Sequence, residues 1–331
     1  MILDGASSEA IARAAQALAR GELVAFPTET VYGLGADASR DEAVARIFDA
    51  KGRPRDHPLI VHVCDAPIVA QFASDVPAVA KRLMDAFWPG PLTLILPRRA
   101  GVAEGAAGGH PTVGVRCPAH PVAHALLVAC AALDPPVPGL AGPSANRFGR
   151  VSPTTALHVE EEFGSGLLVL DGGPCRVGIE STIVDVSRGA PVLLRPGMLP
   201  LDELEAACGE RLLLPHEVAG PRTAAAGTLE AHYAPRAKLR LMDAKMLQTA
   251  LDLLGEDAPN IAVYARAPLR PRSHRIRLRR MPDSAAETAR QLFAVLREFD
   301  AQGVQLIWVE PPPEASEWDG VRDRLRRAAA S

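Results

Sequence analysis

Three cationic side chains lie within five residues at the start of the segment 51–62, which reads Lys-Gly-Arg-Pro-Arg-Asp-His-Pro-Leu-Ile-Val-His. Lys51, Arg53 and Arg55 repel one another, and two prolines stiffen the backbone that carries them, after a glycine suited to the left-handed end of a helix. A polyanion such as a nucleoside triphosphate would relieve that repulsion. The segment therefore predicts a phosphate-binding loop, with a solvated basic turn as the alternative.

A second polar segment, 27–35, reads Pro-Thr-Glu-Thr-Val-Tyr-Gly-Leu-Gly. It places two hydroxyls, a carboxylate and a phenol after a proline that ends a strand, and Gly33 and Gly35 permit close backbone approach. Such a cluster is suited to recognising a small zwitterion. The alternative is a polar connection between a strand and a helix.

Arg116 and His120 follow another short apolar run, 112–115. An arginine at the carboxyl end of a strand in an α/β sheet is well placed to contact phosphate. His120 lies at the start of a predicted helix, 120–133, where free backbone N–H groups favour anions. For Arg116 the alternative is a surface ion pair.

These residues must be positioned by alternating strands and helices. In the first part of the chain we expect helices at 10–19, 76–87 and 120–133 and strands at 23–26, 59–63, 92–96, 112–115, 167–170, 183–186 and 191–194. Another helix should begin at a capping box, Ser39-Arg-Asp-Glu42, and end at a left-handed Gly52, which would aim the basic loop. His62 lies inside the apolar strand 59–63 and is either a core histidine or a ligand contact.

Beyond residue 237 the alternation restarts, with strands at 238–242, 261–265, 276–280 and 304–309 and helices at 244–254, 284–301 and 319–330. This order predicts a smaller open α/β domain. The segment 270–280 is strongly basic. It is either a docking face for a partner or RNA, or a solvated strand edge whose charge prevents pairing.

Composition limits the class of protein. With 331 residues, 48% of them hydrophobic and 23% charged, the chain can bury a full core and form two domains. We see no run of 18 apolar residues and no signal peptide, so we expect a cytoplasmic protein without membrane contact. The five cysteines have no close spacing, which argues against disulfides and a zinc site and predicts buried reduced thiols.

The charge divides unevenly along the chain. Residues 1–205 carry 17 basic and 23 acidic side chains, a net charge of −6, whereas the remainder carries 19 and 16, a net charge of +3. An acidic first domain is a poor general surface for nucleic acid. The basic loop is therefore interpreted as a feature of a local pocket.

Seven motifs in order resemble the YrdC/Sua5 family, in its long two-domain form. They are Pro-Thr-Glu-Thr-Val-Tyr-Gly-Leu at 27–34, Lys-Gly-Arg-Pro at 51–54, Pro-Leu-Ile-Val-His at 58–62, Pro-Gly-Pro-Leu-Thr at 89–93, Pro-Ser-Ala-Asn at 143–146, Glu-Ser-Thr-Ile-Val-Asp at 180–185 and Arg-Pro-Gly at 195–197. The resemblance implies a YrdC-like α/β catalytic domain with a twisted mixed sheet (1–205), a linker crossing the active site (206–236) and a Rossmann-like α/β Sua5 domain (237–331).

The resemblance also implies a nucleotidyltransferase that joins L-threonine, bicarbonate or CO2, and ATP. The products would be L-threonylcarbamoyladenylate and pyrophosphate, with Mg2+ accompanying ATP. The adenylate would pass to a tRNA threonylcarbamoyl transferase complex for t6A modification, with possible contact to tRNA. Such chemistry needs positioning and neutralisation of phosphate charge, and no covalent nucleophile.

Carried over to this chain, the family pattern assigns residues to threonine and to the nucleotide, and we add Lys51 and Tyr32 as further pocket residues. Threonine would be surrounded by Thr30, His62, His120, Ser144 and Ser181, with Tyr32 as a further pocket residue. The nucleotide would be contacted by Arg53, His57, Arg116, Gly142, Asn146, Ser152, Arg195 and Tyr233. The catalytic cations would be Lys51, Arg53 and Arg195, and no direct protein ligand to the metal is expected.

Two departures from the family pattern stand out. Many members have Asn in place of His57, and the linker reads Ala225-Ala-Gly where Pro-Gly is common. A long connection of this kind suits a functional lid, and the resemblance implies that it crosses the mouth of the active site, so we expect Tyr233 to close over the nucleotide and exclude water.

Two other functions remain possible at this point. One is a module that binds double-stranded RNA, although aromatic residues make up just 4% of the chain. The other is a maturation factor that forms carbamoyl-adenylate. Those larger chains also carry acylphosphatase and cysteine-rich zinc segments, and the cysteine spacing here matches neither.

Overall fold

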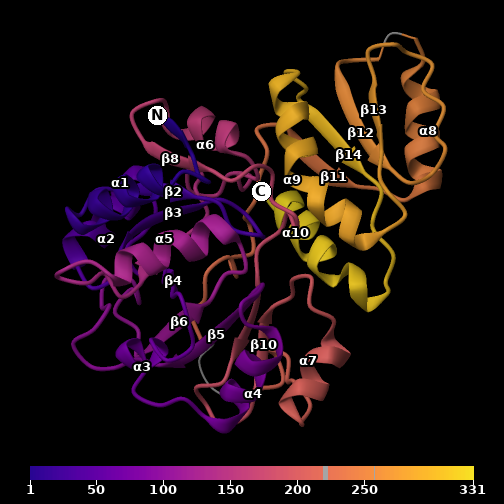
Figure 1. Ribbon diagram of the computed structural model, residues 1–331. Helices are drawn as coiled ribbons and strands as arrows, with labels where there is room; N and C mark the ends of the chain where they lie inside the picture. Colours follow the sequence, from indigo (N-terminus) through magenta and orange to yellow (C-terminus); the bar gives the residue numbers. More distant parts are fainter. Residues whose placement is uncertain (219–222, 257) are drawn as a thin grey trace. The chain divides into compact units, whose positions relative to one another are not determined.

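The computed structural model describes residues 1–218, 223–256 and 258–331. They fall into two compact units, one comprising 1–148 and 152–228 and the other 149–151 and 229–331. In Figure 1 the first unit runs from indigo to pink and the second is mainly orange and yellow. The predicted linker, 206–236, is divided between the two units at 228, and its residues 219–222 lie outside the described part of the chain.

Within the described residues, the first unit contains a mixed sheet of ten strands, ordered β1-β8-β2-β3-β7-β4-β6-β5-β9-β10. Strand β4 pairs parallel with β6, and β5 pairs parallel with β9, whereas β2 with β3 and β5 with β6 are antiparallel. The strands are β1 Ile2–Asp4, β2 Val24–Phe26, β3 Gly33–Asp37, β4 Ile60–His62, β5 Leu92–Pro97, β6 Thr112–Arg116, β7 Leu140–Ala141, β8 Leu168–Asp171, β9 Thr182–Asp185 and β10 Val192–Arg195. The expected mixed-sheet α/β fold is confirmed.

Helices accompany this sheet, and alternate residues of its strands enter two different apolar clusters. Ala25 of β2 joins one cluster, whereas Val24 and Phe26 join the other, which also contains Leu18 and Leu126. Strands covered on both faces are buried throughout, which explains their continuous apolar runs. The helices are α1 Ser8–Ala19, α2 Asp41–Lys51, α3 Val69–Phe72, α4 Ala78–Phe87, α5 Pro121–Ala131, α6 Ala156–Phe163 and α7 Leu201–Cys208.

The predicted capping box is wrong. Helix α2 begins after Arg40, which makes no side-chain capping bond. The hydroxyl of Ser39 instead donates to Asp37 Oδ1 at 2.7 Å, and the Ser39 N–H donates to the same oxygen at 2.9 Å. The helix does end at Gly52 in the left-handed conformation (φ 65°), as predicted, so α2 delivers Lys51 to the site.

Strand β3 shows why the segment 27–35 could also be interpreted as a connection. All five residues of β3 are buried, so no alternation of polar and apolar residues marks the strand. Its glycines are required by packing, since a Cβ on Gly35 would lie 2.9 Å from Cε1 of Phe26. Strands β1 and β7 and helices α3 and α7 were likewise not predicted.

The second unit contains a parallel sheet ordered β11-β14-β12-β13. Its strands are β11 Lys238–Leu241, β12 Ile261–Ala265, β13 Arg277–Arg280 and β14 Leu306–Val309, and its helices are α8 Ala244–Leu254, α9 Ala285–Ala301, the short η1 Ser316–Trp318 and α10 Asp319–Ala329. The smaller open α/β domain is therefore confirmed. Strand β13 lies at the sheet edge with all four residues exposed, as expected for the basic segment.

Four of the five cysteines, all but Cys64, are buried, and each thiol is free. Burial raises the pKa of the Cys117 thiol to about 11 and that of Cys130 to about 12. These are inert core thiols, as the sequence predicted. Among the described residues, no helix combines the length and the apolar character needed to cross a membrane.

Candidate active site

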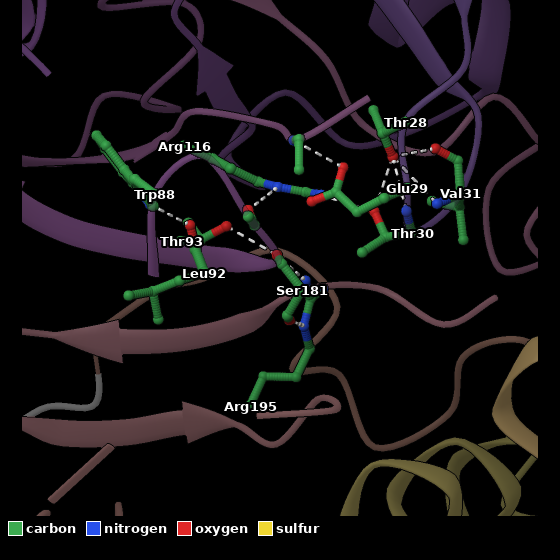
Figure 2. Close-up of polar contacts among 12 residues, drawn as sticks. Thr28, Glu29, Thr30, Val31, Trp88, Leu92, Thr93, Arg116, Ser181 and Arg195 are labelled. Atoms are coloured by element: carbon green, nitrogen blue, oxygen red, sulfur yellow. Dashed lines mark hydrogen bonds and ion pairs between the residues drawn. The ribbon is translucent and has the colours of Figure 1, made fainter. Parts of the chain in front are cut away.

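A buried ion pair joins the polar segment after β2 to the end of β6. Nη2 of Arg116 lies 2.6 Å from Oε1 of Glu29, and the two side chains are 4% and 5% exposed. Glu29 Oε2 also accepts the N–H of Ala119 at 3.2 Å. Figure 2 shows Arg116 extending toward Glu29. Arg116 therefore forms an ion pair, which was the alternative to a phosphate contact. The pair lies in the interior, however, and not at the surface as that alternative expected.

The same arginine orients a predicted threonine contact. Nη1 of Arg116 donates to the hydroxyl of Thr30 at 2.9 Å. The Thr28 hydroxyl accepts the N–H groups of Thr30 and Val31, both at 3.2 Å, and so closes the turn that holds Thr30 in place (Figure 2). Sequence reasoning did not name Thr28 or Glu29 individually, although both lie in the polar segment that it singled out.

A second arginine–hydroxyl cluster joins Arg195 to Ser181 (Figure 2). Arg195, at the end of β10, donates through Nη2 to the Ser181 hydroxyl at 3.2 Å and through Nε to the Ser181 carbonyl at 3.0 Å. Ser181 Oγ lies 2.8 Å from the hydroxyl of Thr93 on β5. The remaining guanidinium nitrogen, Nη1, donates to the carbonyl of Ala226 at 2.8 Å, so Arg195 also holds part of the predicted linker.

Lys51 is buried and fixes a loop. Its ammonium donates to the carbonyl of Ser144 at 2.6 Å and to the carbonyl of Asn146. Burial lowers the pKa of Lys51 well below its usual value, and the nearby Arg53 charge adds to this effect. The predicted catalytic cation therefore acts here as the support of the segment 143–146.

The imidazole of His62 is enclosed. Its Nδ1 is buried and has no hydrogen-bond partner among the described residues. Burial, followed by the charge of Arg116, lowers its pKa to about 3. A Cβ on Gly142 would lie 2.9 Å from Nδ1, so the glycine lets the 142–146 turn lie against the ring. His62 is therefore a core histidine, and its expected contact with threonine stays a prediction.

His120 occupies the N-cap of α5, close to its predicted position. Its Nδ1 accepts the N–H of Val122 at 3.2 Å, which leaves the proton of the neutral ring on Nε2. Burial lowers the pKa of His120, so the neutral form is favoured. Gly172 passes so close that an added Cβ would meet Cε1 at 2.5 Å.

Tyr32 joins the polar segment to the turn that follows β8. Its hydroxyl lies 2.8 Å from the carbonyl of Gly173 and 3.1 Å from Oδ1 of Asp171, and it accepts the N–H of Gly172 at 3.2 Å. Burial raises the pKa of this phenol. The hydroxyl is therefore engaged by the protein, and Tyr32 supports the turn that covers His120.

The ring of Phe148 lies close to two predicted nucleotide contacts, Arg53 and His57. Phe148 itself was not predicted as a site residue. The guanidinium of Arg53 lies 6.0 Å from its ring centroid, and the ring of His57 lies 5.6 Å away. Arg53 also donates to the carbonyl of Pro58 at 3.0 Å. Burial, and then the charge of Arg53, lower the pKa of His57. Arg55, in contrast, is exposed and pairs with Asp49 on α2.

Asn146 and Ser152 lie on either side of a short loop, and both are buried. Asn146 Nδ2 donates to the carbonyl of Arg147 at 2.7 Å, and the Ser152 hydroxyl donates to the carboxylate of Glu180. Glu180 directly precedes Ser181, so the motif at 180–185 contributes to two clusters. Glu180 belongs to the motif quoted from the sequence, but it was not predicted as a site residue.

Tyr233 belongs to the second unit. Its ring stacks on Phe293 of α9 with centroids 5.6 Å apart, and the Arg324 guanidinium lies 5.4 Å from the ring centroid. The side chain is buried. Its expected contact with the nucleotide stays a prediction.

The chain is similar to known proteins over most of its length. Residues 16–197 match the Sua5/YciO/YrdC family, described as telomere recombination, and residues 199–330 match the family described as threonylcarbamoyl-AMP synthase, C-terminal domain. The chain is 39% identical to threonylcarbamoyl-AMP synthase of Pyrococcus abyssi, covering 96% of this chain and 93% of that protein. It is 35% identical to the Bacillus subtilis enzyme of that name, covering 96% and 92%.

Among solved structures, P. abyssi Sua5 complexed with L-threonine aligns with a TM-score of 0.86 at 39% identity, covering 96% of this chain and 94% of that one. Both the sequence and the structural similarity extend across the two units. The chain therefore belongs to the Sua5/YciO/YrdC family, in the two-domain form that carries the threonylcarbamoyl-AMP synthase C-terminal domain.

Proposed function

We propose that this protein is a threonylcarbamoyl-AMP synthase, a nucleotidyltransferase that uses L-threonine, bicarbonate or CO2, and ATP. The observation that carries the proposal is the pairing of two hydroxyls with two buried arginines, Thr30 with Arg116 and Ser181 with Arg195. Hydroxyls suit a zwitterionic amino acid, the guanidinium group of Arg195 suits phosphate oxygens, and Arg116, which is paired with Glu29, holds the Thr30 hydroxyl in place. The similarity to threonylcarbamoyl-AMP synthases over nearly the whole chain supports the same reaction.

The reaction requires two bonds to form. The neutral amine of threonine attacks CO2, forming an N–C bond and releasing a proton, and a carbamate oxygen then attacks the α-phosphorus of ATP. The bond from that phosphorus to the bridging oxygen breaks, and pyrophosphate leaves with the bond electrons. The protein's part is to align the reactants and to neutralise charge on the phosphates.

The residues divide these tasks. Arg195 and Arg53 are the guanidinium groups that would neutralise phosphate charge, and Lys51 supports the loop that carries Asn146. An imidazole whose pKa is about 3 accepts a hydrogen bond but not a proton at neutral pH, so His62 would orient a donor group of threonine. We propose that Mg2+ arrives on the phosphate oxygens of ATP and supplies further charge neutralisation when bound.

Pyrophosphate release tests the reaction. Purified protein would be given ATP, Mg2+ and bicarbonate with and without L-threonine, and the adenylate would be identified by its mass. Threonine-dependent release together with the mass of threonylcarbamoyl-AMP supports the proposal. Release without threonine would indicate a carbamoyl-adenylate-forming enzyme or an ATPase. No release would contradict the proposal and favour RNA binding.

The finer expectations also remain proposals. The product would pass to a tRNA threonylcarbamoyl transferase complex in the cytoplasm, and the exposed arginines of β13 would be a surface for tRNA. Binding of tRNA through them should weaken with salt, and replacing Arg277 and Arg279 by Gln should reduce the salt slope by roughly one unit per lost phosphate contact. An unchanged slope would identify β13 as a solvated edge.

A further inference from the structure

Four residues of the first unit form a chain of hydrogen bonds that ends at a backbone carbonyl (Figure 2). The hydroxyl oxygen of Thr28 lies 2.6 Å from the carbonyl oxygen of Val31 and 2.8 Å from the hydroxyl oxygen of Thr30. Nη1 of Arg116 lies 2.9 Å from the same Thr30 oxygen. The side chains of Thr28, Thr30 and Arg116 are buried, so bulk water does not compete for these bonds.

The partners of each hydroxyl fix the direction of its proton. A carbonyl oxygen only accepts hydrogen bonds, so the single proton of the Thr28 hydroxyl lies toward Val31. The N–H groups of Thr30 and Val31 donate to the Thr28 oxygen from other sides, at 3.2 Å. The 2.8 Å bond between the two hydroxyls therefore uses the proton of Thr30, because two oxygens at that distance repel each other without a proton between them.

The Thr30 hydroxyl is thereby left with acceptor capacity alone. Its proton is directed at Thr28, and one of its two lone pairs takes the N–H of Arg116. A guanidinium group only donates hydrogen bonds, and the ion pair with Glu29 holds this one in place. The remaining lone pair of Thr30 can accept a hydrogen bond from a ligand, but Thr30 has no proton left to donate to one.

Ser181, the other hydroxyl paired with an arginine, differs in this respect. It accepts from Arg195 at 3.2 Å and shares a 2.8 Å bond with the hydroxyl of Thr93. Either hydroxyl of that pair can be the donor. When Thr93 donates, the proton of Ser181 is left for a ligand, so Ser181 can serve a carboxylate whereas Thr30 cannot.

We propose that Thr28 is a positioning residue that fixes the Thr30 hydroxyl as a hydrogen-bond acceptor for the α-amine of L-threonine. This inference deepens the proposed function and rests on it. The carboxylate of threonine has no proton to donate, and its β-hydroxyl can either donate or accept. The ammonium group has donors alone and needs acceptors once it leaves water, so it is the group that a fixed acceptor matches best.

The fixed polarity also suits the chemistry of the amine. The amine must lose a proton before its lone pair attacks CO2. An acceptor holds one of the remaining N–H groups and leaves that lone pair free. A hydroxyl with a free proton would donate it to the lone pair and oppose the attack, so Thr28 keeps Thr30 from inhibiting the reaction.

Three substitutions isolate this role. Thr28→Val removes the acceptor for the Thr30 proton with little change of shape, and Thr28→Ala repeats the test if valine does not fit the buried turn. Thr28→Ser keeps the hydroxyl and should rescue binding. Thr112→Val is the matched control, because Thr112 is a half-buried threonine at the start of β6, the strand that ends at Arg116.

Binding of L-threonine, measured by calorimetry, gives the first readout. Thr28→Val should weaken binding about fivefold, the effect of one hydrogen bond, whereas Thr28→Ser and Thr112→Val should stay within about twofold of the wild type. The KM for ATP should change by less than about twofold in all of them. Unchanged threonine affinity in Thr28→Val and Thr28→Ala, or an equal loss of ATP affinity, would overturn the proposal.

A substrate analogue identifies the group that Thr30 accepts. L-2-aminobutanoate retains the α-amine of threonine but lacks the β-hydroxyl. Thr28→Val should weaken its binding by the same factor as that of threonine. A loss confined to threonine would show that Thr30 serves the β-hydroxyl and would overturn the assignment to the amine.

A double-mutant cycle shows whether Thr28 acts through Thr30. In a Thr30→Val background, adding Thr28→Val should change threonine affinity by less than about twofold. Additive losses would overturn the positioning role. If the wild type binds threonine but forms no threonylcarbamoyl-AMP, the proposed function fails while the cycle still decides the role of Thr28. A wild type that does not bind threonine would overturn both.

Discussion

The carboxylate of Glu29 and the guanidinium of Arg116 form an ion pair of 2.6 Å whose side chains are almost completely buried. The pair does more than neutralise two charges. Glu29 accepts the N–H of Ala119, and Arg116 donates to the Thr30 hydroxyl and, at 3.3 Å, to the carbonyl of Gly90. The polar segment after β2 is thereby fixed to the carboxyl end of β6, and several expected outcomes follow from such contacts.

Replacing Glu29 by Gln should destabilise the fold. The substitution leaves the buried guanidinium of Arg116 without its counter-ion, and breaking a buried pair in this way costs roughly 3–5 kcal/mol. Chemical denaturation measures the loss. Glu22→Gln is the control, since Glu22 pairs with Arg20 at an exposed site and its loss should change little. Equal stability of the two variants would contradict the importance of the Glu29 pair.

Thr93→Val should weaken threonine binding without removing any predicted substrate contact. The Thr93 hydroxyl shares a 2.8 Å hydrogen bond with Ser181, so its loss leaves the Ser181 hydroxyl held by Arg195 alone, at 3.2 Å, and less firmly oriented. We expect the KM for threonine to rise by about fivefold, corresponding to one hydrogen bond of ~1 kcal/mol. Thr249→Val, on α8, is the matched control. A change confined to the KM for ATP would show that Ser181 serves the nucleotide.

Arg195→Ala should lower kcat/KM for ATP by roughly a hundredfold, because a positioned cation near developing phosphate charge contributes about that factor. Arg195→Lys should recover little, since one ammonium cannot donate to Ser181 and Ala226 as the planar guanidinium does. Arg211, which is exposed and pairs with Glu217, provides the control substitution Arg211→Lys. Near-normal turnover by Arg195→Ala would exclude Arg195 from the phosphate site.

His62 should make the fold sensitive to acid. Its folded pKa, about 3, is below the ordinary value of 6.5, so between these values the unfolded chain binds the proton more tightly. Stability is therefore fully present above 6.5 and falls as the pH drops, by at most ~1.4 kcal/mol per pH unit. His62→Gln should flatten this slope in pH-dependent denaturation. His274→Gln, at an exposed site, should leave the slope unchanged; a slope unaffected by either substitution would contradict this assignment.

Tyr233→Phe tests the proposed lid with little effect on packing, because the ring that stacks on Phe293 is retained. If the hydroxyl closes the site over the nucleotide, ATP affinity should fall and the adenylate should hydrolyse sooner. Tyr233→Ala should show both effects and also lose stability, by about 3–5 kcal/mol for a buried aromatic side chain. Unchanged affinity and product lifetime in both variants would rule out the lid.

Local signals in the sequence accounted for most elements of the fold. The strand predicted at 261–265 has the same bounds in β12, and the helix predicted at 244–254 has the same bounds in α8. The end of α2 at Gly52 was predicted because glycine readily adopts the left-handed backbone conformation that ends many helices. Such features depend on residues close together in the chain, so composition and period reveal them.

Contacts between distant residues decided the rest. Strand β7 has two residues and exists because Ala141 pairs with both Ala36 and Val61. The burial of Lys51 depends on carbonyls 93 and 95 residues away, and the engagement of Tyr32 depends on a turn about 140 residues away. The sequence identified Lys51 and Tyr32 as side chains that could take part in binding or catalysis. Their partners, and hence their roles as supports, are fixed by packing of remote segments, which no local pattern encodes.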